Sequence, residues 1–190
     1  WATAEATDKL KKQLGCRTRE QVLDRLRVDY PVSVGPEYIG PKLPRMTDVF
    51  GCKYRNVPYG EGAGAGVYRE VVEHPLARYS SVEEIERDYA WPSPDWYDYT
   101  AIPDQIKGKE THPIRGGGSE PFLIYKSLRG QEQGFIDLME NPDIAHYCLD
   151  KLFGLAYENT RRIYEAIPGQ VMITYVAEDM GGQTDLMFSP

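Results

Sequence analysis

A chain of 190 residues, 41% of them hydrophobic, is long enough to bury one sizeable core. Its formal net charge of -7, without any basic tract, argues against binding to a nucleic-acid backbone. No apolar run approaches the roughly 18 residues of a membrane span. The three cysteines are scattered without a Cys-x-x-Cys pair, which argues against a disulfide framework and favours a reducing, cytoplasmic compartment.

The amino-terminal residues predict two helices followed by a strand. Residues 7–14 have the pattern of a short helix. Thr18 and Gln21 form a capping box, in which the Thr18 hydroxyl accepts the Gln21 amide, and this box opens a second helix. Residues 28–34 are a candidate strand, although a proline within it makes the strand irregular.

Residues 41–74 differ from this pattern and predict a β-hairpin insertion. Two segments rich in β-forming residues, 49–57 and 67–72, flank a glycine-rich run at 60–66. That run contains neither Gly-x-Gly-x-x-Gly nor Gly-Lys-Ser/Thr, and no helix follows it directly. We therefore interpret it as a flexible hairpin tip rather than a phosphate-binding loop.

A second capping box and an aromatic segment follow. Ser81 and Glu84 open a short helix. Residues 91–99 are aromatic and acidic, and their prolines prevent a helix. We expect this segment to pack across the outside of the domain, with a sugar or peptide site as the alternative.

A glycine triplet provides the first candidate site. It follows a short predicted strand at residues 112–115 and precedes a predicted helix at 122–128. We expect a turn whose backbone N–H groups, together with those of the helix start, favour an anion. The turn should line a ligand cavity, with two aromatic side chains of the helix below it. The candidate substrate-binding residues here are Gly116, Gly117, Gly118, Phe122 and Tyr125.

The longest predicted helix covers residues 142–166 and contains the sequence His146-Tyr147-Cys148. A His-x-Cys pair suggests zinc, but residues two apart on a helix point about 200° away from each other. We therefore expect Cys148 in the core and His146 at the surface, and we predict no metal site within this chain.

The second candidate site follows an uncharged, β-branched run at residues 171–176, which predicts a strand covered on both faces. Glu178 and Asp179 come directly after it, and ligands in α/β folds bind at the carboxyl ends of strands. Two close carboxylates in a pocket shielded from water suit acid or base chemistry. The alternative is a cap or a salt bridge at the strand end. If the pair is catalytic, Glu178→Gln and Asp179→Asn should lower turnover or ligand affinity and leave the melting temperature nearly unchanged.

The order of these elements predicts an α/β fold. Its later part is βαβ, which implies parallel strands with right-handed crossovers, so segments 112–115 and 171–176 should be neighbouring parallel strands. A closed (β/α)8 barrel needs about 200 residues or more. The chain therefore predicts part of a larger barrel, or a sheet completed by another chain.

An ordered series of short segments runs along most of the chain. It includes Arg27-Val28-Asp29-Tyr30, Tyr38-Ile39-Gly40-Pro41, Asp48-Val49-Phe50-Gly51, Tyr68 to Ala77, Tyr89-Ala90-Trp91-Pro92 and Ala177 to Thr184. This series resembles the uroporphyrinogen decarboxylase family, and more narrowly its branch of methyltransferases that act with corrinoid proteins. The resemblance implies a (β/α)8 TIM-type barrel, of which residues 1–190 are a single domain from the amino-terminal part, with the hairpin insertion at 41–74.

The resemblance also implies an activity. It favours methyl transfer between a small methylated substrate and a corrinoid protein, with zinc bound by a His-x-Cys and a later Cys that lie beyond this chain. The pair Glu178 and Asp179 would line the pocket, with Gln183 as a hydrogen-bond partner. Whether the protein forms a homo-oligomer stays open.

Two alternatives to methyl transfer stay open. A porphyrinogen-type decarboxylase would use a strand-end carboxylate to stabilise a protonated pyrrole while carbon dioxide leaves. However, the arginine-containing Met-Arg-Gln-Ala-Gly-Arg segment of the true decarboxylases is not in this chain. The second alternative is a truncated, non-catalytic interaction module.

Overall fold

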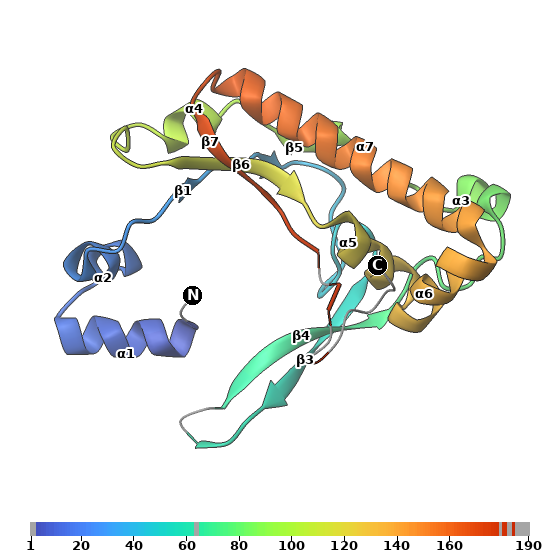
Figure 1. The fold of residues 1–190 in the computed structure, drawn as a ribbon, viewed down its shortest axis with the longest axis horizontal. Helices are drawn as coiled ribbons and strands as arrows, with labels where there is room; N and C mark the ends of the chain where they lie inside the picture. The colour runs from blue at the N-terminus through green and yellow to red at the C-terminus, as the bar shows by residue number, and fades with distance from the viewer. Residues whose placement is uncertain (1–2, 63–64, 179, 182–183, 185–190) are drawn as a thin grey trace.

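The computed structural model describes residues 3–62, 65–178, 180–181 and 184, and shows a mixed α/β chain (Figure 1). The elements in chain order are α1 (Ala4–Leu14), α2 (Arg19–Leu26), β1 (Val32–Ser33), β2 (Glu37–Tyr38), β3 (Lys53–Tyr59), β4 (Gly66–Glu73), α3 (Val82–Asp88), the 3-10 helix η2 (Pro94–Trp96), β5 (Tyr97–Asp98), α4 (Ile102–Gln105), β6 (Ile114–Ser119), α5 (Pro121–Arg129), α6 (Gln131–Glu140), α7 (Pro142–Ala166) and β7 (Val171–Val176).

The central sheet is parallel and has the strand order β1-β6-β7. Val32 pairs with Ile114 in one ladder, and Ile114 pairs with Val171 in the other. The predicted parallel pairing of segments 112–115 and 171–176 is therefore confirmed. The amino-terminal strand is shorter than expected, because only Val32–Ser33 of the candidate segment 28–34 forms a ladder.

Helix α7 covers one face of this sheet (Figure 1). Its residue Ile163 and the following residue Ile167 form a small buried cluster with Val34, Ile102 and Ile114. Among the described residues no helix covers the other face, and β7 is exposed along most of its length. The expectation that residues 171–176 are covered on both faces is therefore wrong for the described part of the chain. The described strands form sheets of two or three strands, and none of these sheets closes into a barrel.

The expectation of a turn at the glycine triplet is wrong, because β6 continues through Gly116, Gly117 and Gly118 to Ser119. The backbone φ angles of Gly117 and Gly118 are +74° and +93°, in the region that glycine adopts without strain. The ladder to β7 shifts register at this point. The Gly118 N–H instead donates to the Thr160 hydroxyl of α7 at 3.0 Å, so the strand bends without ending.

The main hydrophobic core lies around α5, α6 and α7. Apolar residues of α5 and α7 pack there against the segment that follows the hairpin, and the fully buried members include Leu76, Ile85, Tyr125, Leu128, Ala145 and Cys148. Helices α5 and α7 lie close to the predicted ranges 122–128 and 142–166, since Gly130 ends α5 and Pro142 starts α7.

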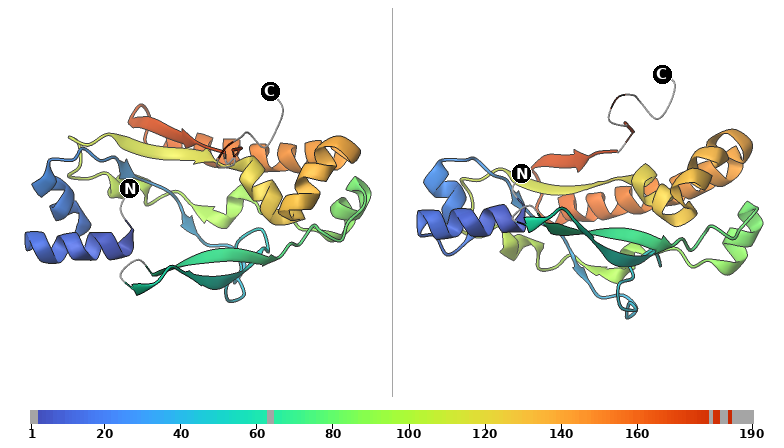
Figure 2. Two further views of the ribbon diagram at one scale, coloured as in Figure 1. Left: turned by 60° about the horizontal axis from the view of Figure 1, so that its bottom comes forward. Right: turned by 90° about the horizontal axis from the view of Figure 1, so that it is seen from below.

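The other predicted local structures are also present. The hairpin β3–β4 is antiparallel, pairs Tyr59 with Gly66, and extends away from the sheet and helices (Figures 1 and 2). One half of each capping box forms as predicted: the hydroxyls of Thr18 and Ser81 accept the backbone N–H groups of Gln21 and Glu84. The side chains of Gln21 and Glu84 reach back one residue further, to the N–H groups of Arg17 and Ser80. No helix in the described part of the chain is both long enough and apolar enough to cross a membrane.

The aromatic segment at 91–99 lies at the margin of the two cores, where Trp91 packs against the main core and Tyr99 against the smaller cluster. It contains η2 and β5, and β5 pairs with β2 in a separate two-stranded sheet. The Trp91 ring packs edge-on against Tyr89 at 5.0 Å and against Tyr147 of α7 at 6.2 Å between ring centroids. This segment therefore packs against the outer side of α7, as the packing interpretation predicts.

Candidate functional site

The carboxyl edge of the parallel sheet places Glu178 at the start of α5. Its two carboxylate oxygens accept the backbone N–H groups of Phe122 at 2.8 Å and Leu123 at 3.0 Å. Glu120, the residue preceding the helix, makes no side-chain cap bond of its own. The first N–H groups of a helix have no partner within the helix and favour negative charge, so Glu178 satisfies them from a distant part of the chain.

This geometry matches the alternative that the sequence left open, in which the strand-end carboxylate is a cap. Both oxygens of Glu178 are engaged by backbone donors. A role as acid or base would therefore require one of these bonds to be released. Asp179 and Gln183, the other candidate residues of this stretch, lie outside the described residues.

A hollow of about 230 Å³ lies between the carboxyl ends of β6 and β7, the first residue of α5 and the helix α7. Its lining is largely apolar and comprises Gly118, Ser119, Pro121, Phe153, Ala156, Tyr157, Thr160, Thr174 and Val176. Of the five predicted substrate-binding residues described here, Gly118 lines this hollow, while Gly117 and Gly116 lie one and two residues before it in the same strand.

Phe122 and Tyr125 do not line the hollow and belong to the core. Phe122 is 6% exposed and Tyr125 is fully buried. The Phe122 ring packs against Tyr125 at 6.2 Å and Phe135 of α6 at 5.8 Å between centroids. The helical register was predicted correctly, but the face that it defines points toward α6 and α7 rather than toward a ligand.

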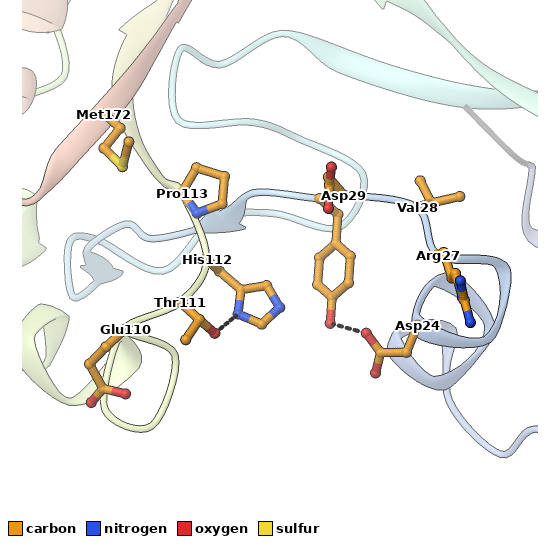
Figure 3. Close-up of a pocket in the computed structure, with 10 residues that line it drawn as sticks. Asp24, Arg27, Val28, Asp29, Glu110, Thr111, His112, Pro113 and Met172 are labelled. Carbon is orange, nitrogen blue, oxygen red and sulfur yellow. Dashed lines mark hydrogen bonds between the residues drawn. The ribbon is translucent and has the colours of Figure 1, made fainter.

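A second, larger hollow of about 810 Å³ lies at the opposite, amino end of the strands (Figure 3). Tyr30 and His112 face each other across it, with ring centroids 5.0 Å apart. The Tyr30 hydroxyl donates to Asp24 at 3.4 Å, and the Thr111 hydroxyl lies 3.3 Å from His112 Nδ1. Sequence analysis did not identify this hollow, because it forms only where the segment after α2 meets the segment before β6.

A buried ionic network was also missed by sequence analysis. Arg129 of α5 and Asp137 of α6 are 3% and 0% exposed and form a two-pronged pair, with Nε and Oδ2 2.6 Å apart. The Arg129 guanidinium also donates to the carbonyls of Leu76 and Tyr79 at 2.5 and 2.8 Å. Tyr125 donates its hydroxyl to Asp137 at 2.8 Å. These bonds tie α5 and α6 to the segment that contains Leu76 and Tyr79.

The same network sets the charge state of Asp137. Burial acts to raise the pKa of this carboxyl group, but hydrogen bonds from Arg129, Gln133 and Tyr125 outweigh burial and lower the pKa. Asn141 adds a further donor at 3.1 Å. The carboxylate is therefore held in its charged form inside the core.

The described residues contain no group of three or more His, Cys, Asp or Glu side chains that could hold a metal ion. The expectation for the His-x-Cys pair is confirmed, since His146 is exposed and Cys148 is fully buried in the core. Burial raises the pKa of both Cys52 and Cys148 to about 12. Neither thiol is poised to act as a thiolate ligand or nucleophile.

Comparisons of the chain with protein-family models, with curated proteins and with solved structures gave no match.

Proposed function

We propose that this chain belongs to a uroporphyrinogen decarboxylase-like enzyme with a (β/α)8 barrel, which transfers a methyl group between a small methylated substrate and a corrinoid protein. The observation that carries the proposal is the parallel sheet β1-β6-β7, in which strands follow chain order as they do around a barrel. The sequence resemblance described above supports the choice of family.

The arrangement of the sheet fits one segment of a barrel. Helix α7 crosses back over the face of the sheet between β6 and β7, as in a βαβ unit. The edge of β7 carries no neighbour strand among the described residues, and its side chains are exposed, with Met172 73% and Val176 68% accessible. A further strand and helix would cover this edge in a complete barrel.

The site of this enzyme would lie at the carboxyl ends of the strands, where barrel enzymes bind their substrates. Glu178 occupies that position and, by holding the start of α5, fixes the relation between β7 and the helix after β6. We assign Glu178 a positioning role in the proposed reaction. The described residues do not fit a zinc site, so no step is assigned to a metal ion bound by this part of the chain.

The test is a methyl-transfer assay on the protein with a reduced corrinoid and a panel of O-, N- and S-methylated small molecules. Methylation of cobalt changes the visible spectrum, which gives a direct readout. We expect methylation with at least one member of the panel, and a lower rate for Glu178→Gln. The matched control is Glu120→Gln, which removes a neighbouring carboxylate that makes no cap bond and should retain the parent rate.

Two outcomes would contradict the proposal. Release of carbon dioxide from a porphyrinogen, without any methyl transfer, would identify a decarboxylase. Absence of both reactions would leave a non-catalytic module, an alternative that the exposed β7 edge and the extended hairpin favour because both offer surface for another chain.

A further inference from the structure

We propose that the face of the sheet opposite α7 carries a binding site for a small organic carboxylate, centred on Arg115 of β6. Arg115 is the second residue of β6, toward the amino ends of the strands, and Tyr175 lies near the carboxyl end of β7. In the barrel proposed above this face would be the inner one, so the site does not rest on the methyl-transfer activity but must be reachable inside that barrel.

The direction of the Arg115 side chain follows from the alternation along β6. Its neighbours Ile114 and Gly116 face α7, where Ile163 packs against them. Arg115 therefore points to the opposite face, beside Ser33 of β1, with which it is paired in register. The guanidinium lies over the Tyr175 ring of β7, 5.6 Å from the ring centroid.

A hollow of about 640 Å³ opens in front of this guanidinium. Strands β1, β6 and β7 supply one wall, and α2 with the segment after it supplies the other. The lining residues that matter for binding are Arg19, Leu23, Val28, Ser33, Arg115 and Tyr175, and Asp29 contributes the single carboxylate.

The hollow gathers hydrogen-bond donors around a partly buried charge. Within residues 3–62, 65–178, 180–181 and 184, the guanidinium of Arg115 makes no ion pair or hydrogen bond, and it lies over the ring of Tyr175. Ser33, Tyr175 and Arg19 also line the hollow, and their side chains are exposed to solvent. A partly buried charge without a counter-ion is unfavourable, so an anion in the hollow would relieve this cost.

The chemistry of the hollow selects the class of anion. A guanidinium offers a planar fork that matches a carboxylate through two parallel hydrogen bonds, and the Tyr175 ring fixes the plane of the fork. Leu23 and Val28 give the remaining wall an apolar character suited to the body of an organic acid. A small carboxylate with a flat apolar body can bind the guanidinium fork and also contact the apolar wall, whereas inorganic phosphate can bind only the guanidinium.

The test uses benzoate as the probe and benzamide as its uncharged counterpart, in a ligand-observed NMR titration of the protein. We expect benzoate to bind and benzamide to bind at least tenfold more weakly. Arg115→Met should weaken benzoate binding about tenfold or more, because a charge-assisted two-pronged contact is lost. Arg115→Lys should weaken it less, since lysine keeps the charge but loses the fork.

The matched control is Arg25→Met, which removes an exposed arginine of α2 that does not line the hollow. It should leave benzoate binding within twofold of the parent, and circular dichroism should confirm that every variant is folded. Equal binding of benzoate by the parent and Arg115→Met would overturn the proposal. An equal loss of benzoate binding in Arg25→Met would also overturn it, because it would indicate a general attraction between the anion and the positive charges of the protein. Tighter binding of inorganic phosphate than of benzoate would overturn it as well.

Discussion

Glu178 connects the end of β7 to the start of α5 through two backbone N–H groups, and this makes its contribution to stability measurable. Sequence analysis expected Glu178→Gln to leave the melting temperature nearly unchanged, whereas the cap predicts a loss. Glu178→Ala should lower the free energy of unfolding by about 1 kcal/mol, which is the usual contribution of a helix-capping side chain to stability. Glu178→Gln should cost less, because an amide oxygen still accepts one bond but carries no charge.

Urea denaturation of the two variants checks this prediction, with Glu120→Ala as the control. Glu120 precedes α5 directly and makes no side-chain cap bond, so its removal should change stability by less than about 0.5 kcal/mol. If Glu178→Ala is as stable as the parent, the two N–H groups have other partners in solution and the positioning role is wrong.

At the scale of single elements, β6 depends on its glycines. A Cβ atom on Gly118 would lie 1.7 Å from the Tyr175 carbonyl oxygen, and the φ angle of +93° is one that L-residues rarely adopt. We expect Gly118→Ala to lower the free energy of unfolding by about 3 kcal/mol or more, since strain and loss of the β7 ladder add together. Denaturation and hydrogen exchange of the β7 amides measure both effects.

Gly154 of α7 offers the opposite control. Its added Cβ would meet nothing within 4 Å, and it lies in a helix interior. Gly154→Ala should raise stability by about 0.5–1 kcal/mol through helix propensity. A Gly118→Ala variant that is as stable as Gly154→Ala would contradict the described path of β6.

The same strand shows where sequence reasoning succeeds and where it stops. The parallel pairing with β7 was predictable, because an uncharged run of β-branched residues is a local signal. The extension of β6 through the glycines was not, because it depends on Thr160, a residue of α7 far along the chain. A β-branched residue at Gly117 should impair folding for the same reason, because its Cβ would lie 2.6 Å from the Thr160 side chain.

At the scale of the whole molecule, the Arg129–Asp137 pair joins α5 and α6 to the carbonyls of residues 76 and 79. No local pattern marks it, since its partners come from three separate segments. Removing one partner leaves a buried unpaired charge, and Asp137→Leu should cost about 3–5 kcal/mol. The double variant Arg129→Met with Asp137→Leu should cost less than the sum of the two single variants. A double-mutant cycle by chemical denaturation measures this coupling, and strict additivity would contradict it.

The same pair predicts how stability depends on pH. The folded-state pKa of Asp137 is lowered, so its contribution is fully present above the unfolded value of about 4 and is lost as pH falls through the lower folded value. The stability difference between the parent and Asp137→Asn should therefore be constant from pH 7 to about pH 5 and shrink below about pH 4. Denaturation at a series of pH values measures it, and a difference that grows on acidification would contradict the charged state of Asp137.

The pairing of β1 with β6 has a consequence for the order in which the chain folds. Helices α5, α6 and α7 follow one another directly and pack together, so their contacts close only short loops. Strand β1 instead pairs with β6, and the hairpin, α3 and α4 lie between these two strands in the chain. Their pairing closes a long loop, which is slow. In pulse-labelled hydrogen exchange during refolding, the amides of α7 should therefore become protected before the amide of Val34, which donates to the Arg115 carbonyl. During synthesis, β1 leaves the ribosome long before its partner exists, and the amino-terminal segment stays without its sheet until most of the chain has been made.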